Sequence, residues 1–352
     1  MKKGSKNKRG KNLARLKKDL EKGKEKTKAY PAVLYLEATA ICNLRCPMCP
    51  TTMGIPREPY RKNVFDLDLL PKIEPVLPYI SRCFMSGGGE PLLHPELFRI
   101  IATVKDHGAP VYFNCNATLL SEERARLMVE HGVDTISFSV DGATDETYSK
   151  IRVGAELGTT VENIKRLAEI KKQAGAKRPF LNMQFTLLDL NRHEVEEMVP
   201  LAASLGINQL VVEPLTPVFS FDRAYRDYYN QHAVAPDAAL MESLEAASRK
   251  AREQGLIFSS HYLYARDNPE PPRKCVQPWL TFGVRVDGRV FTCCGTMEQM
   301  GDLSVEDWHR IWNGEKYRSL RRAVARGAFP EFCPLCIKEN RANHFNEELL
   351  GG

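Results

Sequence analysis

The sequence predicts an α/β fold: a partial (β/α)6 TIM-like barrel followed by a small C-terminal domain of one β-hairpin and one helix. Between residues 33 and 215, six short apolar runs alternate with longer segments of helical periodicity. Successive βα units pair their strands in parallel through right-handed crossovers, so the six units build a parallel sheet, open or closed into a barrel. Beyond residue 275, Asp287 and Gly288 separate two short apolar runs, which is a strong β-hairpin signal.

The helices between the expected strands carry recognisable start and stop signals. Ser121 precedes two glutamates, as an N-cap followed by acidic residues that suit the helix dipole. Glycines stand where four of the helices should end. In such a fold the functional side chains lie at the carboxyl ends of the strands. The expected strands are Val33–Glu37, Cys83–Ser86, Val111–Cys115, Thr135–Val140, Asn182–Leu187 and Gln209–Glu213.

Shifts in composition and the positions of the prolines divide the 352 residues into five segments. A stretch rich in aromatic residues and without a clear period follows the sixth strand, and a stretch with three prolines precedes the hairpin. The first could cover a substrate or pack on the barrel. We expect a basic tail over residues 1–29, the barrel over 30–215, an aromatic-rich insertion with a helix and linker over 216–274, the hairpin domain over 275–340 and a C-terminal tail over 341–352.

The net charge of +6 is unevenly distributed. Residues 1–29 contribute +10, which leaves −4 on the rest of the chain. Because no aromatic residue precedes Tyr30 to stack on bases, we expect a solubilising tail here and no nucleic-acid partner. No apolar run is long enough for a membrane span, and no apolar core of a signal peptide follows the basic start. We therefore expect a cytoplasmic protein whose ten cysteines are not paired in disulfides.

Three cysteines follow the first expected strand with the spacing C-x3-C-x2-C, at Cys42, Cys46 and Cys49. Three thiolates on one loop can bind a compact metal centre and leave one metal position without a protein ligand. Structural zinc sites usually have four protein ligands, whereas soft thiolates also suit iron–sulfur clusters.

The motif Cys42-Asn-Leu-Arg-Cys46-Pro-Met-Cys49, followed after the second strand by Ser86-Gly-Gly-Gly-Glu-Pro91, resembles the radical SAM superfamily. The resemblance implies that the three cysteines bind a [4Fe–4S] cluster whose unique iron chelates S-adenosylmethionine. An electron from the cluster then cleaves the cofactor to methionine and a 5′-deoxyadenosyl radical, which abstracts a substrate hydrogen. The glycines Gly87, Gly88 and Gly89 would let the backbone approach the methionine ammonium group, and Glu90 would add negative potential.

Other matches to the family are weaker. The segment Ser137-Phe-Ser-Val-Asp-Gly142 resembles the fourth-strand motif that meets the ribose and methionine, which makes Ser139 and Asp141 candidates. Arg152 resembles the arginine that faces the methionine carboxylate. Met48 occupies a position near adenine that is often aromatic. Asn116 resembles the first residue of an Asn-Gly pair that often ends the third strand, although Ala117 replaces the glycine here.

Four further cysteines lie near and beyond the hairpin: Cys275, Cys293, Cys333 and Cys336. Their spacing alone is compatible with structural zinc, an iron–sulfur cluster or unpaired thiols. The arrangement of Cys275, Gly288 and Cys293 resembles the start of the SPASM/twitch extension of radical SAM enzymes. There are too few cysteines for the full set of two auxiliary clusters, so the resemblance implies the shorter twitch-like form with one auxiliary [4Fe–4S] cluster.

The resemblance leads to an oxidoreductase that oxidises its substrate by two electrons through the auxiliary cluster. Cys294 leaves an alternative open, because it could replace Cys293 as ligand, be buried, or donate a hydrogen atom in a redox-neutral epimerase. A peptide-modifying radical SAM enzyme is a further alternative, and a non-enzymatic zinc or nucleic-acid-binding protein is a distant one. The expected partners are a small-molecule or peptide substrate and a flavodoxin- or ferredoxin-type electron donor, which the basic segment 1–29 could dock.

Overall fold

The structure is a computed structural model that describes residues 3–55, 60–269, 275–293, 298–330, 333 and 347–350. It separates into two compact units, each assembled from segments that are distant in sequence. The first unit comprises Met1–Ile41, Pro59–Val111 and Glu270–Gly352, and the second comprises Cys42–Glu58 and Tyr112–Pro269. Within the described part of the chain, no helix is long and apolar enough to cross a bilayer.

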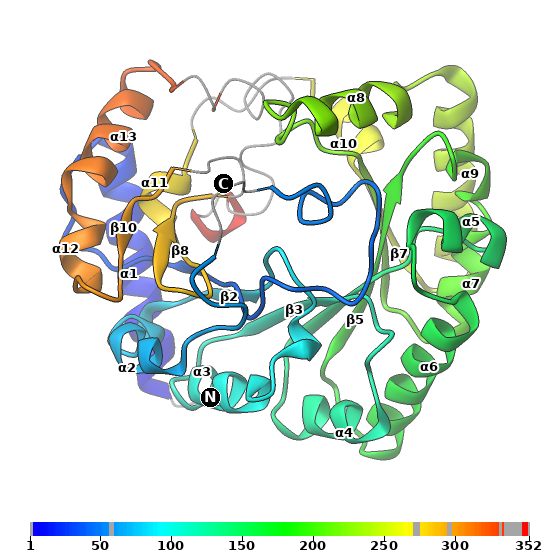
Figure 1. Ribbon diagram of the computed structural model, residues 1–352, viewed down its shortest axis with the longest axis horizontal. Helices are drawn as coiled ribbons and strands as arrows, with labels where there is room; N and C mark the ends of the chain where they lie inside the picture. The colour runs from blue at the N-terminus through cyan, green and yellow to red at the C-terminus, as the bar shows by residue number, and fades with distance from the viewer. Residues whose placement is uncertain are drawn as a thin grey trace. The chain divides into compact units, whose positions relative to one another are not determined.

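The second unit is a parallel sheet with the strand order β3-β4-β5-β6-β7. Figure 1 shows helices α4, α6, α7 and α9 along the outer side of these strands. In β5 the residues alternate between buried and half-buried, so that one face supplies core residues such as Met183 and Phe185. The strands are β3 (Val111–Cys115), β4 (Thr135–Ser139), β5 (Phe180–Leu187), β6 (Gln209–Pro214) and β7 (Ile257–Ser260).

The helices of the second unit begin and end largely where the sequence indicates. The Ser121 hydroxyl accepts a hydrogen bond from the Arg124 amide at 3.3 Å and caps α4, as expected. Strand β7 was not predicted, because Ile257 and its neighbours form a short run that is only partly buried. The helices are α4 (Glu122–Glu130), α5 (Asp145–Ile151), α6 (Leu157–Gln173), η4 (Arg192–Glu194), α7 (Met198–Ser204), α8 (Arg223–His232), α9 (Ala238–Glu253) and α10 (His261–Asp267).

The first unit contains β1 (Val33–Leu36), β2 (Arg82–Met85), β8 (Thr281–Val284), β9 (Arg289–Phe291) and β10 (Gly301–Asp302). The predicted hairpin is present, because β9 runs antiparallel to β8. Strand β8 also pairs in parallel with β1, on the side of β1 opposite β2. All four residues of β8 are buried, as expected for an interior strand that is covered on both faces. The hairpin thus extends the sheet that contains β1.

The remaining helical elements of the first unit surround this sheet, and α13 lies beside β10 in Figure 1. They are α1 (Lys3–Glu21), η1 (Leu67–Leu69), α2 (Leu70–Ile73), η2 (Leu77–Tyr79), η3 (Pro91–Leu93), α3 (Leu97–Asp106), α11 (Gln277–Leu280), α12 (Trp308–Trp312), α13 (Glu315–Ala325) and η5 (Glu347–Leu350).

Helix α1 is packed into the first unit, in contrast to the basic tail expected for residues 1–29. Leu16 is fully buried and packs with Val33 and Leu280. Asn12 donates to the Tyr30 carbonyl and accepts from the Tyr30 amide, both at 2.9 Å. The Arg9 guanidinium donates to the Gly108 carbonyl at 2.8 Å. Most of the lysines of α1 are exposed, so the helix is basic on its outer face and anchored on its inner face.

Candidate functional site

The first cysteine set lies on a loop of the second unit. Of its three cysteines, Cys46 is buried, whereas Cys42 and Cys49 are half-buried. The loop is tightly wound, because the Cys49 amide donates to the Cys46 carbonyl at 3.0 Å and the Leu44 amide points at the Cys42 sulfur at 3.4 Å. Met48, in the turn before Cys49, is buried. The sequence places three thiols within one short, hydrogen-bonded loop.

Asn116 connects the end of β3 to this loop. Its side-chain nitrogen donates to the Asn43 side-chain oxygen at 3.0 Å and lies 3.9 Å from the Cys42 sulfur. Ala117 has a φ of 61°, in the left-handed region that favours glycine. The Asn163 side chain donates to the Ala117 carbonyl at 2.9 Å and supports this conformation. The turn that an Asn-Gly pair would form is therefore retained with alanine, at a conformational cost.

Asp141 and Arg152 form a buried ion pair, with Arg152 Nε 2.5 Å from Asp141 Oδ2. A terminal nitrogen of Arg152 lies 3.9 Å from the Cys46 sulfur. Burial raises the pKa of Cys46, and the Arg152 charge opposes that shift. Burial also acts to lower the pKa of Arg152, but Asp141 and Cys46 outweigh it and raise this pKa, so the guanidinium stays charged. Ser139, the last residue of β4, is half-buried.

The glycine segment after β2 lies in the first unit and packs against the residues that follow β1. A side chain at Gly87 would overlap the Glu37 side chain, and one at Gly89 would overlap the Ile41 backbone. The Glu90 carboxylate is buried and accepts from the Leu92 amide at 3.1 Å, which caps η3. Within this unit, Gly87 and Gly89 are needed for close backbone approach, and Glu90 has a capping role that the sequence did not indicate.

Glu37 is a site residue that the sequence analysis treated only as a strand end. Its carboxylate is buried and accepts from the Gly88 amide at 2.9 Å and from the Tyr60 hydroxyl at 3.0 Å. Burial raises the pKa of Glu37, and these hydrogen bonds oppose the shift. The available signal was a carboxylate at the carboxyl end of an apolar strand, where functional residues of parallel sheets gather.

The second cysteine set lies in the first unit. Cys275 precedes α11, Cys293 follows β9, and Cys333 follows α13; all three are half-buried. Burial raises the pKa of Cys333 to about 11. Cys294 and Cys336 lie outside the described residues. Among those that are described, no three His, Cys, Asp or Glu side chains form a site for a single metal ion.

The donor chemistry of the first set fits an iron–sulfur cluster. Soft thiols are the preferred ligands of such clusters, and hydrogen bonds to their sulfurs tune the reduction potential. Cys42 has amide donors from Leu44 and Asn116, and Cys46 has the Arg152 guanidinium. The second set also offers only thiols, so both sets fit the same type of group.

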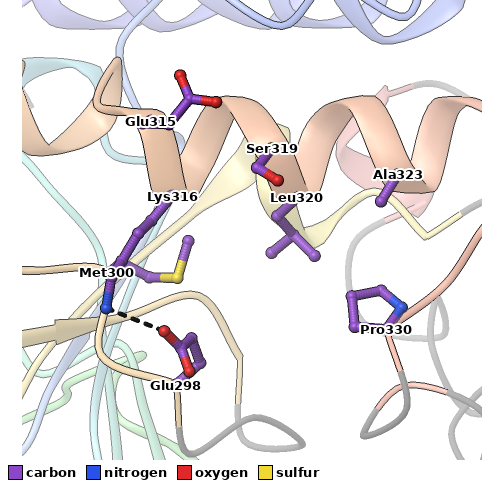
Figure 2. Close-up of a pocket in the computed structure, with 8 residues that line it drawn as sticks. All are labelled: Glu298, Met300, Glu315, Lys316, Ser319, Leu320, Ala323 and Pro330. Carbon is purple, nitrogen blue, oxygen red and sulfur yellow. Dashed lines mark hydrogen bonds and ion pairs between the residues drawn. The ribbon is translucent and has the colours of Figure 1, made fainter.

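A pocket of about 350 Å³ lies beside α13 in the first unit. Two of its lining residues, Lys316 and Glu298, form an ion pair at 2.9 Å, which is the dashed line in Figure 2. The lining comes from the chain that follows Cys293 and the chain that precedes Cys333. No motif in the sequence indicates this pocket. Its lining residues are Glu298, Met300, Glu315, Lys316, Ser319, Leu320, Ala323 and Pro330.

Two family models match the parts of the chain that contain the two cysteine sets. A family model described as the radical SAM superfamily matches residues 36–202, and one described as an iron–sulfur cluster-binding domain (SPASM) matches residues 275–337. The tungsten-containing aldehyde ferredoxin oxidoreductase cofactor-modifying protein of Pyrococcus furiosus is 30% identical over 189 residues, which are 53% of this chain and about half, 52%, of that protein. The AdoMet-dependent heme synthase of Methanosarcina barkeri is 30% identical over 309 residues, 83% of this chain and 85% of that protein.

A solved structure shares the fold. Streptococcus suis SuiB bound to its precursor peptide SuiA superimposes with a TM-score of 0.66 at 13% identity, covering 87% of this chain and 69% of SuiB. This likeness confirms the predicted fold class, a partial barrel with a C-terminal extension. Together with the family models and the relative that spans most of the chain, it shows that the protein belongs to the radical SAM superfamily, with S-adenosylmethionine and [4Fe–4S] clusters as cofactors and a C-terminal SPASM iron–sulfur domain.

Proposed function

We propose that the protein is an oxidoreductase that removes two electrons from its substrate and passes the second electron to the auxiliary cluster. When bound, S-adenosylmethionine and the cluster on Cys42, Cys46 and Cys49 supply the 5′-deoxyadenosyl radical that takes a substrate hydrogen. The observation that carries the proposal is the second cysteine set in the SPASM region, at Cys275, Cys293, Cys333 and Cys336. Four thiolates would complete the coordination of a cluster, which favours electron transfer over binding of substrate to it.

The residues around the first set keep the loop in one arrangement. The Asp141 carboxylate holds the Arg152 guanidinium near Cys46, so a positive charge stays beside that sulfur when the thiolate forms. Asn116 fixes the loop at Cys42 through Asn43. We propose that Arg152 and Asp141 also contribute to the binding of S-adenosylmethionine, with Met48, Gly87, Gly88, Gly89, Glu90, Asn116 and Ser139 as further contributors.

Iron analysis combined with product analysis tests the proposal. Anaerobically reconstituted protein should hold about eight irons per chain, and replacing Cys42, Cys46 and Cys49 by alanine should remove about four of them and abolish cleavage of S-adenosylmethionine. Replacing the four cysteines of the second set should also remove about four irons, keep cleavage, and stop formation of oxidised product. Net oxidation that persists without the second set would contradict the proposal. Deuterium incorporation from D2O without oxidation would support the epimerase alternative instead.

The electron donor is proposed to be an acidic protein of the flavodoxin or ferredoxin type that docks on the exposed face of α1. Lys8, Lys11, Arg15 and Lys18 are exposed and recur every three or four residues, so they form one basic stripe. Deleting residues 1–29 would remove the buried Leu16 as well, so charge reversal is the cleaner test. Changing these four residues to glutamate should slow reduction by such a donor and weaken its salt dependence, while reduction by dithionite stays unchanged. An unchanged donor rate would exclude this surface.

A further inference from the structure

Arg285, in the turn between β8 and β9, has a distinctive environment. Its side chain is half-buried, and its guanidinium carbon lies 5.8 Å from the ring centroid of Tyr60 and 5.8 Å from that of Phe291. Within the described part of the chain, the guanidinium forms no ion pair. The Glu37 carboxyl is near enough for Arg285 to act to lower its pKa, against the larger effect of burial, yet it lies beyond ion-pair distance. Arg285 is thus a cation stacked on aromatic rings without a bound carboxylate.

The neighbouring arginine differs, because its charge is compensated. Arg289 also stacks on the Tyr60 ring, at 5.5 Å, but it pairs with Asp287 at 2.8 Å. Asp287 also accepts from the Arg61 amide at 3.1 Å. Although burial opposes the shift, these partners hold the pKa of Asp287 below its usual value, so it stays ionised. Of these two arginines stacked on Tyr60, only Arg285 retains an uncompensated charge.

The strand register places Arg285 at the same sheet edge as Glu37, whose carboxylate bonds the glycine segment. Leu36 of β1 pairs with Val284 of β8, so Glu37 and Arg285 leave adjacent strands at the same edge. Glu37 accepts from the amides of Gly88 and Val286, which connects this edge to the segment after β2. The carboxyl end of a parallel sheet is where ligands bind in such folds. Desolvating a cation is costly unless an anion or aromatic faces offset the cost, and the rings do so only in part.

We propose that Arg285 binds a carboxylate of the substrate, with Tyr60 and Phe291 holding its guanidinium plane. The inference deepens the proposed function by naming a substrate class, carboxylic acids, and it rests on that function. A carboxylate matches the single uncompensated positive charge and the two-pronged geometry of a guanidinium. A phosphate dianion would carry one negative charge more than this single guanidinium balances, which disfavours it.

Binding of size-matched probes to the reconstituted holoenzyme tests this assignment. The probes are benzoate, benzamide and phenyl phosphate, with dissociation constants measured by ligand-observed NMR. Benzoate should bind at least about tenfold more tightly than benzamide, because hydrogen bonds to charged groups are stronger than neutral ones. Arg285→Gln should abolish that preference and Arg285→Lys should keep part of it. Arg326→Gln, at an exposed arginine that ends α13, is the control and should change nothing.

Three results would overturn the proposal. Equal binding of benzoate and benzamide, or a preference that survives in Arg285→Gln, would exclude a carboxylate site at Arg285. Tighter binding of phenyl phosphate than of benzoate would assign the site to phosphate. The carboxylate could also belong to S-adenosylmethionine, so its affinity is measured as well. An unchanged affinity in Arg285→Gln supports a substrate site, and a tenfold loss would transfer the assignment to the cofactor.

Failure of the Arg285 assignment can be distinguished from failure of the proposed function. The probe affinities require no turnover, so they test Arg285 even if the substrate is not oxidised. Conversely, cleavage of S-adenosylmethionine with dithionite is measured on the unmodified protein, and absence of cleavage there would count against the proposed function while leaving the affinities valid.

Discussion

Replacing Asp141 by asparagine tests whether the buried ion pair with Arg152 determines the stability of the second unit. The Asp141 side chain is fully buried and only 15% of the Arg152 side chain is exposed, so neither charge is well solvated. Removing one partner of a buried pair leaves the other charge uncompensated, at a cost of about 3–5 kcal/mol. Asparagine keeps an oxygen that can accept from the Thr186 amide, which donates to Asp141 at 2.6 Å. We therefore expect a loss of about 3 kcal/mol, at the lower end of the range.

Anaerobic urea unfolding followed by circular dichroism measures this loss. With an m-value of about 3 kcal/mol/M, the midpoint of Asp141→Asn should fall by about 1 M. The urea midpoint of Arg152→Gln should fall by at least as much as that of Asp141→Asn. The double variant should lose about 2 kcal/mol less than the sum of the two, because the neutral amides no longer leave a lone buried charge. Lys150→Gln breaks the exposed Glu146–Lys150 pair of α5 and is the control, with no expected change in midpoint. Additive losses for Asp141→Asn and Arg152→Gln would refute the reasoning.

Three further predictions concern other residues. Ala117→Gly should raise the free energy of unfolding by up to about 1 kcal/mol by removing strain at a positive φ, and Ala117→Val should lower it; denaturant midpoints measure both. Leu16→Ala should cost about 2–5 kcal/mol, whereas the exposed Lys17→Ala should cost little, and thermal unfolding would show the difference. Because Arg289 holds the pKa of Asp287 below its usual value, the stability from this pair is present above the usual aspartate pKa and is lost as pH falls below it. Asp287→Asn should therefore flatten the acid side of a stability–pH profile.

The sequence predicted most strands because their signal is local. The first expected strand, Val33–Glu37, differs from β1 by one residue, and Asp287-Gly288 forms the turn of the hairpin as expected. The inner face of α1 carries a short apolar stripe of Leu13, Leu16 and Leu20, which periodicity alone indicates. The hydrogen bonds by which Arg9 and Asn12 extend that face to distant backbone groups were not predictable, because they depend on the tertiary fold.

In the candidate site, too, the residues with a local sequence signal could be predicted and those that meet only through tertiary pairing could not. The cysteines of the loop at residues 42–49 could be identified because their spacing is local, and Asn116 and Arg152 could be added only through family resemblance. Glu37 and Arg285 were missed because their relation depends on the pairing of β1 with β8, which joins residues about 250 positions apart. Once Leu36 is opposite Val284, both next residues must leave the sheet at one edge, whatever their identity. Their proximity is therefore a consequence of register, and a one-residue shift of β8 would move the Arg285 guanidinium away from Glu37 and Tyr60.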